Sequence, residues 1–274
     1  MGTDINNYVI LTNYCTMIKK LTTYYQYFWE YLKHADFVSI ISSVKYLLKK
    51  GSHPNDRIIK TSIGTFFCRK NTNDFQFANY RYEWGVKKFL LENKNKYNVF
   101  IDGGACVGEY CILLTKLGIR CIAFEPVLQN FQVLSKNLEL NDLSAKVLAF
   151  PYGLGDCEMQ APFYFNPVNT GASHIITDKK ATNVFAEIRT FDSFLPQMNL
   201  KHEDRIMVKL DVENMEPEAI RGAAEFIRKF PDITIVAEYK HSGGDSIKTE
   251  LERIAGFEFG FVDEFNIFAT KRKK

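Results

Sequence analysis

The sequence predicts an α/β fold built on a mostly parallel sheet, because short apolar segments alternate with helical patterns from residue 97 onward. A glycine-rich turn follows the first of these segments and an acidic residue ends the second, an order typical of nucleotide-binding sheets. The 274 residues and 46% hydrophobic composition suffice for one large domain with an appended piece. We expect a helical extension over residues 1–56, a lead-in of strands and a helix over residues 57–96, and the main domain over residues 97–274.

The N-terminal extension carries two helical patterns. Apolar residues at three- and four-residue steps predict a helix over residues 14–33, and a second helix includes Ile40 and Leu48 and ends near Gly51. Together they form a helical hairpin. We expect its apolar stripe to be buried against the body or a partner subunit in a homo-oligomer. Peripheral contact with a membrane surface or a lipid-linked acceptor is the alternative.

The remaining elements follow in chain order. Short strands are expected at residues 58–59, 65–68 and 75–77. The main domain offers strands at residues 98–101, 120–124, 146–150, 205–210 and 233–237. Helices are expected between them at residues 109–117, 127–140 and 216–229. After a further helix over residues 246–255, residues 257–262 and 267–270 predict an antiparallel terminal hairpin.

Charge and cysteine usage limit the classes of partner. The net charge is +3, but both ends are basic and residues 61–270 carry five more acidic than basic residues. Because nucleic-acid enzymes present a basic working face, no nucleic-acid partner is expected. The six cysteines include no CxxC pair, which favours reduced thiols and a cytoplasmic location. No apolar run reaches the roughly 20 residues that a membrane-spanning helix needs.

The sharpest motif is the turn after the predicted strand at residues 98–101. It places Asp102, Gly103 and Gly104 at the strand end, and Gly108 opens the next helix. Missing Cβ atoms let a ligand approach the backbone, and the helix N-terminus offers unpaired N–H groups. Glu125 follows the second strand, 21 residues after Gly104, where a carboxylate can accept hydrogen bonds from ribose hydroxyls.

The same turn points to the kind of nucleotide. It lacks the G-x-G-x-x-G spacing of dinucleotide sites, and the Asp102 carboxylate would repel a pyrophosphate. An ammonium and a sulfonium would suit that carboxylate, so S-adenosylmethionine is the expected cofactor. A nicotinamide-dependent oxidoreductase is a less favoured alternative, and a non-catalytic Rossmann-like scaffold is another.

Carboxylates recur at the predicted strand ends. Asp102, Glu125, Asp211 and Glu238 each end one strand, and Lys209 interrupts an otherwise apolar strand. Because ligands bind outside the carboxyl ends of parallel strands, four carboxylates at one edge favour a site there. The alternative is that they cap strands or helices.

These motifs resemble the FkbM-type family of S-adenosylmethionine-dependent methyltransferases over residues 80–240. The matching segments are Ile101–Gly108, Ala123–Pro126, Leu134–Asn141, Gly155-Asp156, Asn169–Ser173 and Lys209–Glu216, with Gly222 and Glu238 where the family has them. The resemblance implies a class I methyltransferase Rossmann-like sheet, parallel with an antiparallel C-terminal hairpin. It also implies O-methylation of a hydroxyl on a sugar, glycan or related small molecule.

Three positions depart from the family pattern. Cys106 stands where the family usually has Asn, Gly103 where it has an aliphatic residue, and Asn214 where it has Gly. Since Asn tolerates left-handed backbone angles, we expect Asn214 to keep the glycine conformation.

The resemblance also assigns roles. Glu125 is expected to hold the ribose, Asp102 and Gly104 to face the methionine moiety, and residues 153–156 to border the adenine. The full cofactor-binding set is Asp102, Gly103, Gly104, Gly108, Glu125, Pro126, Gly155 and Asp156.

The catalytic and acceptor roles fall on the opposite half of the predicted edge. Asp211 is the preferred base or orienting group, with His174 and His241 as the alternative imidazoles. The expected substrate-binding residues are Lys209, Glu213, Glu216 and Glu238. A divalent metal on Asp211, Glu213, Glu238 and His241 is compatible with ligand chemistry, but the spacing matches no metal motif and no metal is expected.

Overall fold

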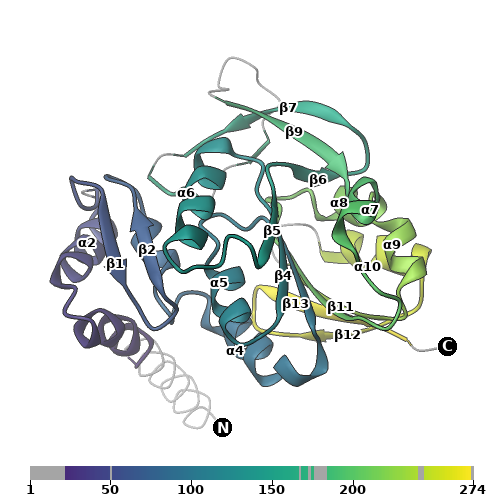
Figure 1. The fold of residues 1–274 in the computed structure, drawn as a ribbon, viewed down its shortest axis with the longest axis horizontal. Coiled ribbons are helices and arrows are strands. Elements are labelled where there is room, and N and C mark those ends of the chain that lie inside the picture. Colours follow the sequence, from purple (N-terminus) through teal and green to yellow (C-terminus); the bar gives the residue numbers. More distant parts are fainter. Residues whose placement is uncertain are drawn as a thin grey trace, which may run out of the picture.

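A seven-stranded sheet forms the centre of the computed structural model, which describes residues 22–49, 51–166, 168–171, 174–175, 184–239 and 244–272 (Figure 1). Its strands are β3 (Val99–Gly103), β4 (Arg120–Phe124), β5 (Val147–Phe150), β10 (Arg205–Leu210), β11 (Asp232–Glu238), β12 (Phe257–Phe261) and β13 (Asn266–Lys271). The spatial order is β12-β13-β11-β10-β3-β4-β5. Strands β11, β10, β3, β4 and β5 pair in parallel, whereas β13 pairs antiparallel with both β11 and β12. The predicted α/β fold is confirmed.

Helices cover both faces of this sheet. On one face α4 (Trp84–Glu92), α5 (Glu109–Lys116) and α6 (Leu128–Glu139) share a core with Phe100 and Met207. On the other, α8 (Glu216–Arg221), α9 (Ala224–Lys229) and α10 (Gly244–Ile254) share a core with Ile101 and Val208. Because successive side chains of a strand point to opposite faces, a strand covered on both sides must be apolar throughout.

Two predicted elements are wrong. Residues 216–229 form two helices, not one. The break lies at Gly222, whose backbone is packed against β6: a Cβ there would lie 1.9 Å from the carbonyl oxygen of Gly155. Residues 75–77 belong to the one-turn helix α3 (Asp74–Phe77) rather than a strand. The Thr72 hydroxyl accepts the Asp74 N–H at 3.2 Å, and such local side-chain bonds close a turn in place of an extended strand.

A four-stranded sheet that the sequence did not predict lies beside the main one (Figure 1). It consists of β6 (Gly153–Gly155), β9 (Val184–Thr190), β7 (Met159–Tyr164) and β8 (His174–Ile175), in that spatial order. Ala161, Phe163, Ala186 and Ile188 pack with Val127 beneath it. The short connecting elements are η1 (Lys94–Lys96), η2 (Phe191–Phe194) and α7 (Leu195–Met198).

The N-terminal part is a helical hairpin beside a small antiparallel ribbon. Residues 22–33 are helical, α2 spans Phe37–Leu47, and β1 (Arg57–Lys60) pairs with β2 (Thr65–Cys68). The predicted burial of the apolar stripe against the body is confirmed only for Tyr31, which is buried in the core, and for Ile40, which packs against it. The fully buried residues of α2 are serines, and most of its large apolar side chains face solvent. Within the described part of the chain, no helix has the length and hydropathy to cross a bilayer.

Candidate active site

A cavity of about 500 Å³ lies at the carboxyl ends of the central strands. Its wall includes Gly104 after β3, Glu125 after β4, Asp211 after β10 and Glu238 at the end of β11. Three of the four predicted strand-end carboxylates therefore meet at one cavity. Its size is within the range of small-molecule sites, and its place is where doubly wound sheets bind ligands.

Gly104 allows two strand ends to approach closely. Its φ is +92°, and a Cβ would lie 1.9 Å from the carbonyl oxygen of Asp211. The N–H of Asp211 donates to the carbonyl oxygen of Gly103 at 2.9 Å, which fixes the two ends together. Because no other residue fits here, the position requires glycine.

Glu125 holds the glycine turn as well as facing the cavity. Its carboxylate accepts the N–H of Cys106 and the N–H of Val127, each at 2.9 Å. Burial raises the pKa of Glu125 to about 7, against the lowering effect of these hydrogen bonds. A carboxylate has about four acceptor positions, so it can still receive ligand hydroxyls.

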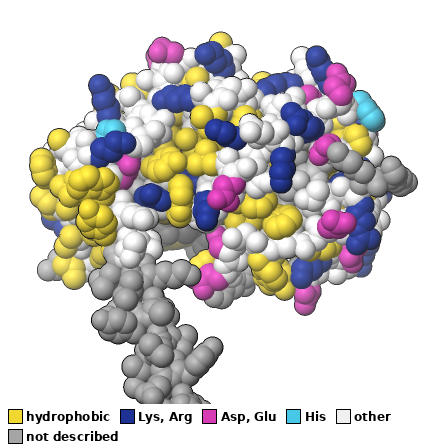
Figure 2. All heavy atoms as spheres, turned by 90° about the horizontal axis from the view of Figure 1, so that it is seen from below, with side chains coloured by type: hydrophobic (Ala, Val, Ile, Leu, Met, Phe, Trp, Pro, Cys, Tyr) yellow, Lys and Arg dark blue, Asp and Glu magenta, His cyan; other side chains and the backbone are white. Residues whose placement is uncertain are grey.

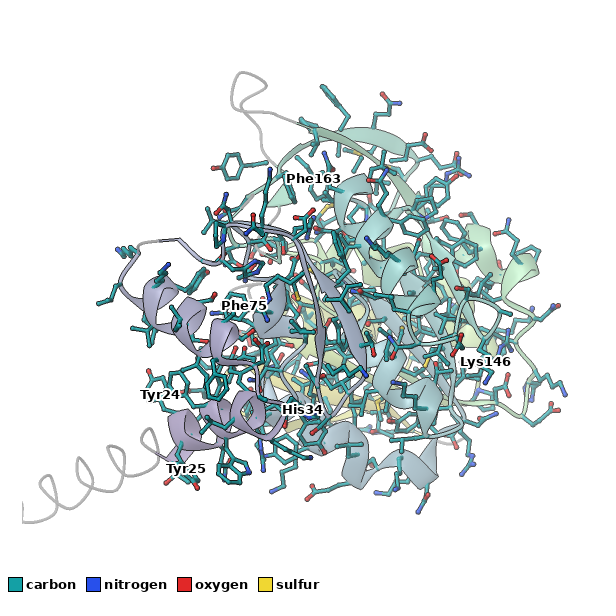
Figure 3. The ribbon with its side chains drawn as sticks, turned by 60° about the vertical axis from the view of Figure 1, so that its left-hand side comes forward. Tyr24, Tyr25, His34, Phe75, Lys146 and Phe163 are labelled. Atoms are coloured by element: carbon teal, nitrogen blue, oxygen red, sulfur yellow. The ribbon has the colours of Figure 1, made fainter. Side chains whose placement is uncertain are left out.

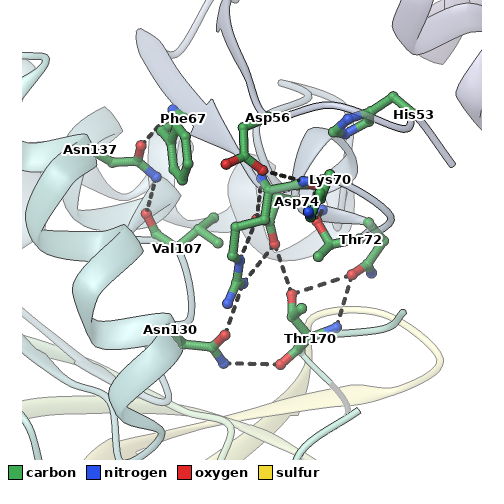
Figure 4. A network of polar contacts seen from close by, with 12 residues as sticks. His53, Asp56, Phe67, Lys70, Thr72, Asp74, Val107, Asn130, Asn137 and Thr170 are labelled. Carbon is green, nitrogen blue, oxygen red and sulfur yellow. Dashed lines mark hydrogen bonds and ion pairs between the residues drawn. The ribbon is translucent and has the colours of Figure 1, made fainter. Parts of the chain in front are cut away.

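Asn137 on α6 and Asn141 just after that helix support the same turn. Asn137 accepts the N–H of Phe67 at 2.7 Å and donates to the carbonyl oxygen of Val107 at 3.0 Å (Figure 4). Asn141 exchanges both backbone hydrogen bonds with Thr65. The segment Leu134–Asn141, which matched the family pattern, thus ties strand β2 to the turn.

Lys209 is buried between carboxylates. Its Nζ lies 2.7 Å from Oδ2 of Asp211, and the register of β10 against β3 sets it beside Asp102. Burial alone would lower the pKa of Lys209, but Asp211, Glu83 and Asp102 together raise it well above its ordinary value. Lys209 therefore remains an ammonium. Burial raises the pKa of Asp102 to about 6, and Oδ1 of Asp102 has no hydrogen-bond partner in the described structure.

Three further charged residues lie on or beside this wall, and no motif had assigned them a role. Glu83 and Glu109 line the cavity, and fully buried Lys87 lies near both. Glu83 accepts the hydroxyl of Tyr110 at 2.6 Å. Burial raises the pKa of Glu109 to about 8, and its Oε2 has no hydrogen-bond partner among described residues. Glu109 follows Gly108 directly, in the first turn of α5, and this position could have identified it as a site residue from the sequence. No sequence pattern marks Lys87 as part of a site.

The loop after β10 carries a strained acidic residue into the cavity. Glu213 and Asn214 both have positive φ, 54° and 73°, and both line the wall. The predicted left-handed conformation of Asn214 is confirmed. Burial, followed by repulsion from Asp211 and Glu238, raises the pKa of Glu213 to about 8.

A buried polar network fixes another part of the wall, residues 169–171 (Figure 4). The Asp74 carboxylate accepts a hydrogen bond from the Thr170 hydroxyl at 3.0 Å and two from the Arg69 guanidinium. Asn130 accepts from Arg69 at 2.9 Å and donates to the Thr170 carbonyl at 3.0 Å. The network joins α3, α6 and this loop, so the N-x-G segment is held rigidly beside the turn.

The structure brings only part of the predicted site together. The predicted residues on the wall are Gly104, Glu125, Pro126, Lys209, Asp211, Glu213 and Glu238. Among the described residues, those outside the wall are Asp102, Gly103, Gly108, Gly155, Asp156 and Glu216. His174 lies in β8, with a side chain outside the described structure, and His241 lies outside the described residues altogether.

The structure explains why several predicted site residues do not line the cavity. Asp156 forms an ion pair with Arg221 at 2.9 Å on the outside of β6. Buried Glu216 accepts the N–H of Val212 at 3.0 Å and shapes the loop from beneath. Gly153 and Leu154 line the cavity in place of Gly155, whose Cβ position faces Ile188. Asp102 is fully buried under the edge rather than facing a ligand.

A metal site finds no support in the described part of the chain. No group of three or more His, Cys, Asp and Glu side chains there has the geometry to hold an ion.

Comparison with known proteins gives a consistent picture. A family model described as the methyltransferase FkbM domain matches residues 102–265. Methyltransferase sdnD of Sordaria araneosa is 24% identical over 214 residues, covering 63% of this chain and 81% of that protein.

Solved structures are more distant. Methyltransferase FkbM from Methylobacillus flagellatus KT superposes with a TM-score of 0.46 at 16% identity, over 64% of this chain and 44% of that chain. This chain thus spans less than half the length of that protein. An O-methyltransferase from Bacillus cereus in complex with SAH superposes with a TM-score of 0.39 at 13% identity, over 69% of this chain and 81% of that one.

Proposed function

Since the chain belongs to the FkbM methyltransferase family, we propose that it transfers a methyl group from S-adenosylmethionine to a hydroxyl oxygen of a sugar, glycan or related small molecule. The observation that carries the proposal is the composition of one cavity wall. Glu125 and the open backbone of Gly104 share that wall with the acidic residues Glu83, Glu109 and Asp211.

The residues present fit this cofactor. Glu125 suits ribose hydroxyls, and Leu154 and Val127 offer apolar surface for an adenine. The free buried oxygen of Glu109 is an acceptor for an ammonium. A pyrophosphate would instead meet several carboxylates, and Lys209 is the one basic side chain among the described lining residues. The predicted repulsion thus rests on Glu83 and Asp211, because Asp102 lies beneath the wall and burial raises the pKa of Glu109 to about 8.

The protein's own contribution is to position the acceptor and handle its proton. When bound, S-adenosylmethionine would supply an electrophilic methyl group on a positively charged sulfur. A hydroxyl is a weak acid, so a base with a pKa near the working pH is favourable. We assign that role to Glu213, whose pKa is raised to about 8 by burial and then by repulsion from Asp211 and Glu238.

Asp211 is proposed as the orienting group. Its carboxylate pairs with the Lys209 ammonium, 2.7 Å away, and can accept a hydrogen bond from the acceptor hydroxyl. His174 and His241 stay as predicted alternatives for the base. Asn169 and Asn214 add amide groups to the wall, which supports an acceptor with several hydroxyls.

A cytoplasmic location is part of the proposal. The five described cysteines are free, and four of them are buried, which supports a reducing compartment.

Titration calorimetry with S-adenosylmethionine, followed by transfer of its labelled methyl group to a panel of sugars and glycans, tests the proposal. We expect saturable binding and label in an acid- and base-stable ether. Tighter binding of NADH, or no binding of S-adenosylmethionine by folded protein with and without Mg²⁺, would overturn it. In those cases the oxidoreductase or the non-catalytic scaffold would be favoured.

A further inference from the structure

The two N-terminal helices present an apolar face to solvent. We define this apolar face by its exposed side chains, which are Tyr24, Tyr25, Trp29, Leu32, Phe37, Val38, Ile41, Val44 and Leu48. Tyr25, Phe37 and Leu48 are 65%, 62% and 60% exposed. Figure 2 shows hydrophobic side chains gathered at this end of the molecule, and Figure 3 shows Tyr24 and Tyr25 on the outer side of their helix. Contiguous exposed apolar surface of this kind marks an interaction site.

Contacts on the opposite sides of the two helices orient the apolar face toward solvent. Glu30 accepts the N–H and hydroxyl of Ser62 at 2.6 and 3.0 Å, and the buried Tyr31 hydroxyl donates to the Phe75 carbonyl at 3.0 Å. On α2 the buried residues are Ser39, Ser42 and Ser43. The helices contact the core through Tyr27, Tyr31 and Ile40. The side chains that define the apolar face lie on the other sides of the two helices and stay outside this core.

The exposed charges on the two N-terminal helices are of one sign. The exposed charged residues of residues 22–49 are Lys33, Lys45 and Lys49, of which Lys33 donates to the Ser62 hydroxyl at 3.0 Å. The two acidic side chains of this segment are engaged inward, Glu30 with Ser62 and Asp36 with Arg57 and Ser39. An apolar strip with lysines beside it is complementary to an anionic surface.

We propose that this apolar face docks the protein on an anionic phospholipid bilayer. Trp29, Tyr24 and Tyr25 are the residue types that favour the bilayer interface, and the lysines would meet lipid phosphates. The 11 residues of α2 are only about 16 Å long, so this helix would lie in the interface rather than cross it.

A second copy of the chain fits this face less well. A two-fold interface would bring Lys45 and Lys49 of both copies into one contact, because such an interface uses the same surface twice. The acidic residues that would neutralise them are already paired within the hairpin.

Co-sedimentation of the full chain with vesicles tests the proposal. We expect binding to vesicles of phosphatidylcholine mixed with phosphatidylglycerol, weak binding to phosphatidylcholine alone, and loss at high salt. The I41S/V44S variant should lose binding, and K45E/K49E should weaken it at least about tenfold. The matched control is F185S, which removes a 65% exposed side chain from β9 on the other sheet.

Fluorescence gives a second readout on the same face. The chain has two tryptophans, so a W84F background reports Trp29 alone, and its emission should shift to the blue with anionic vesicles. Thermal melts establish that each variant is folded. Failure of folded protein to bind anionic vesicles, or equal loss in F185S and I41S/V44S, would overturn the proposal. A dimer that I41S/V44S dissolves, without vesicle binding by the parent chain, would overturn it in favour of an interface between copies.

Discussion

Nζ of Lys209 lies 2.7 Å from Oδ2 of Asp211, and this ion pair sits at the end of β10 where the strand meets the cavity. The same lysine is in register with Asp102 on β3, so one buried ammonium serves two carboxylates. A lysine inside a central parallel strand is thereby explained. Its charge keeps the cavity wall folded in the presence of several neighbouring acids.

Replacing Lys209 with methionine should destabilise the protein by about 3–5 kcal/mol, because two carboxylates lose their buried counter-charge. The free energy of unfolding from urea titration is the measurement. Adding D211N to K209M removes one orphaned charge and should recover part of the loss. Equal stability of K209M and the parent chain would show that water already neutralises these carboxylates.

Replacing Gly104 with alanine should abolish cofactor binding. The substitution combines a positive φ with a Cβ 1.9 Å from the Asp211 carbonyl oxygen, so β3 and β10 must separate. The matched control is G118A, which has a similar φ of +84° but open space around the new Cβ. That control should cost only about 1–2 kcal/mol of stability and bind normally. If G104A and G118A bound the cofactor equally well, the close approach of Gly104 to the Asp211 carbonyl oxygen would not be needed for binding.

Replacing Glu125 with glutamine should weaken S-adenosylmethionine binding at least about tenfold, the effect of losing one or two charge-assisted hydrogen bonds. Calorimetry measures the change. D156N is the control, since Asp156 was predicted from the same family pattern but pairs with Arg221 outside the wall. If D156N weakened binding as much as E125Q, the assignment of the wall would be wrong.

The stability of the ligand-free protein should fall as the pH rises from about 5 to about 8. Burial raises the pKa of Asp102, Glu125 and Glu109 to about 6, 7 and 8, so between the unfolded and folded values the folded state binds more protons. The free energy of unfolding then decreases with pH. Melting temperatures across this range measure it.

The E109Q variant should flatten that slope, because it removes the carboxyl whose pKa is shifted furthest of these three. E92Q is the control, since the Glu92 side chain is 65% exposed and lies 3.8 Å from the Lys88 ammonium on the surface. A parent chain whose melting temperature rises with pH would contradict the assignment of these buried carboxyls.

The strand ends could be predicted well from the sequence. Whether a side chain at a strand end faces the cavity or lies buried beneath it could not. Glu125 and Asp211 follow their strands and face the cavity, as predicted. Asp102 lies one residue inside β3, and the pleat turns it under the wall toward Cys111. The carboxylates that replace it, Glu83 and Glu109, lie next to helix starts, where an acidic residue is ordinarily interpreted as a cap.

Long-range pairing accounts for the other misses. Strand β6 is three residues long and pairs with β9, more than 30 residues later, so no local pattern marks it. In α2 the apolar periodicity was correct, but the polar serine side is buried instead. A local pattern shows that a helix has an apolar and a polar face, but not which of them packs on the body. Here Ser62 binds Glu30 and Arg57 binds Asp36, and these distant partners orient the two helices.

Replacing Cys106 with asparagine should stabilise the protein by about 1 kcal/mol, the scale of the left-handed penalty for ordinary side chains. Cys106 has a φ of 46°, and the backbone is held there by the bond from its N–H to Glu125. Asparagine tolerates this conformation better than cysteine does. The side chain lies on the cavity wall, where an amide can reach water.

Thermal melts measure the gain in stability. C106S is the control, because serine is similar in size to cysteine but lacks the amide that favours a left-handed backbone. A gain in C106S equal to that in C106N would locate the effect in the thiol rather than in the backbone.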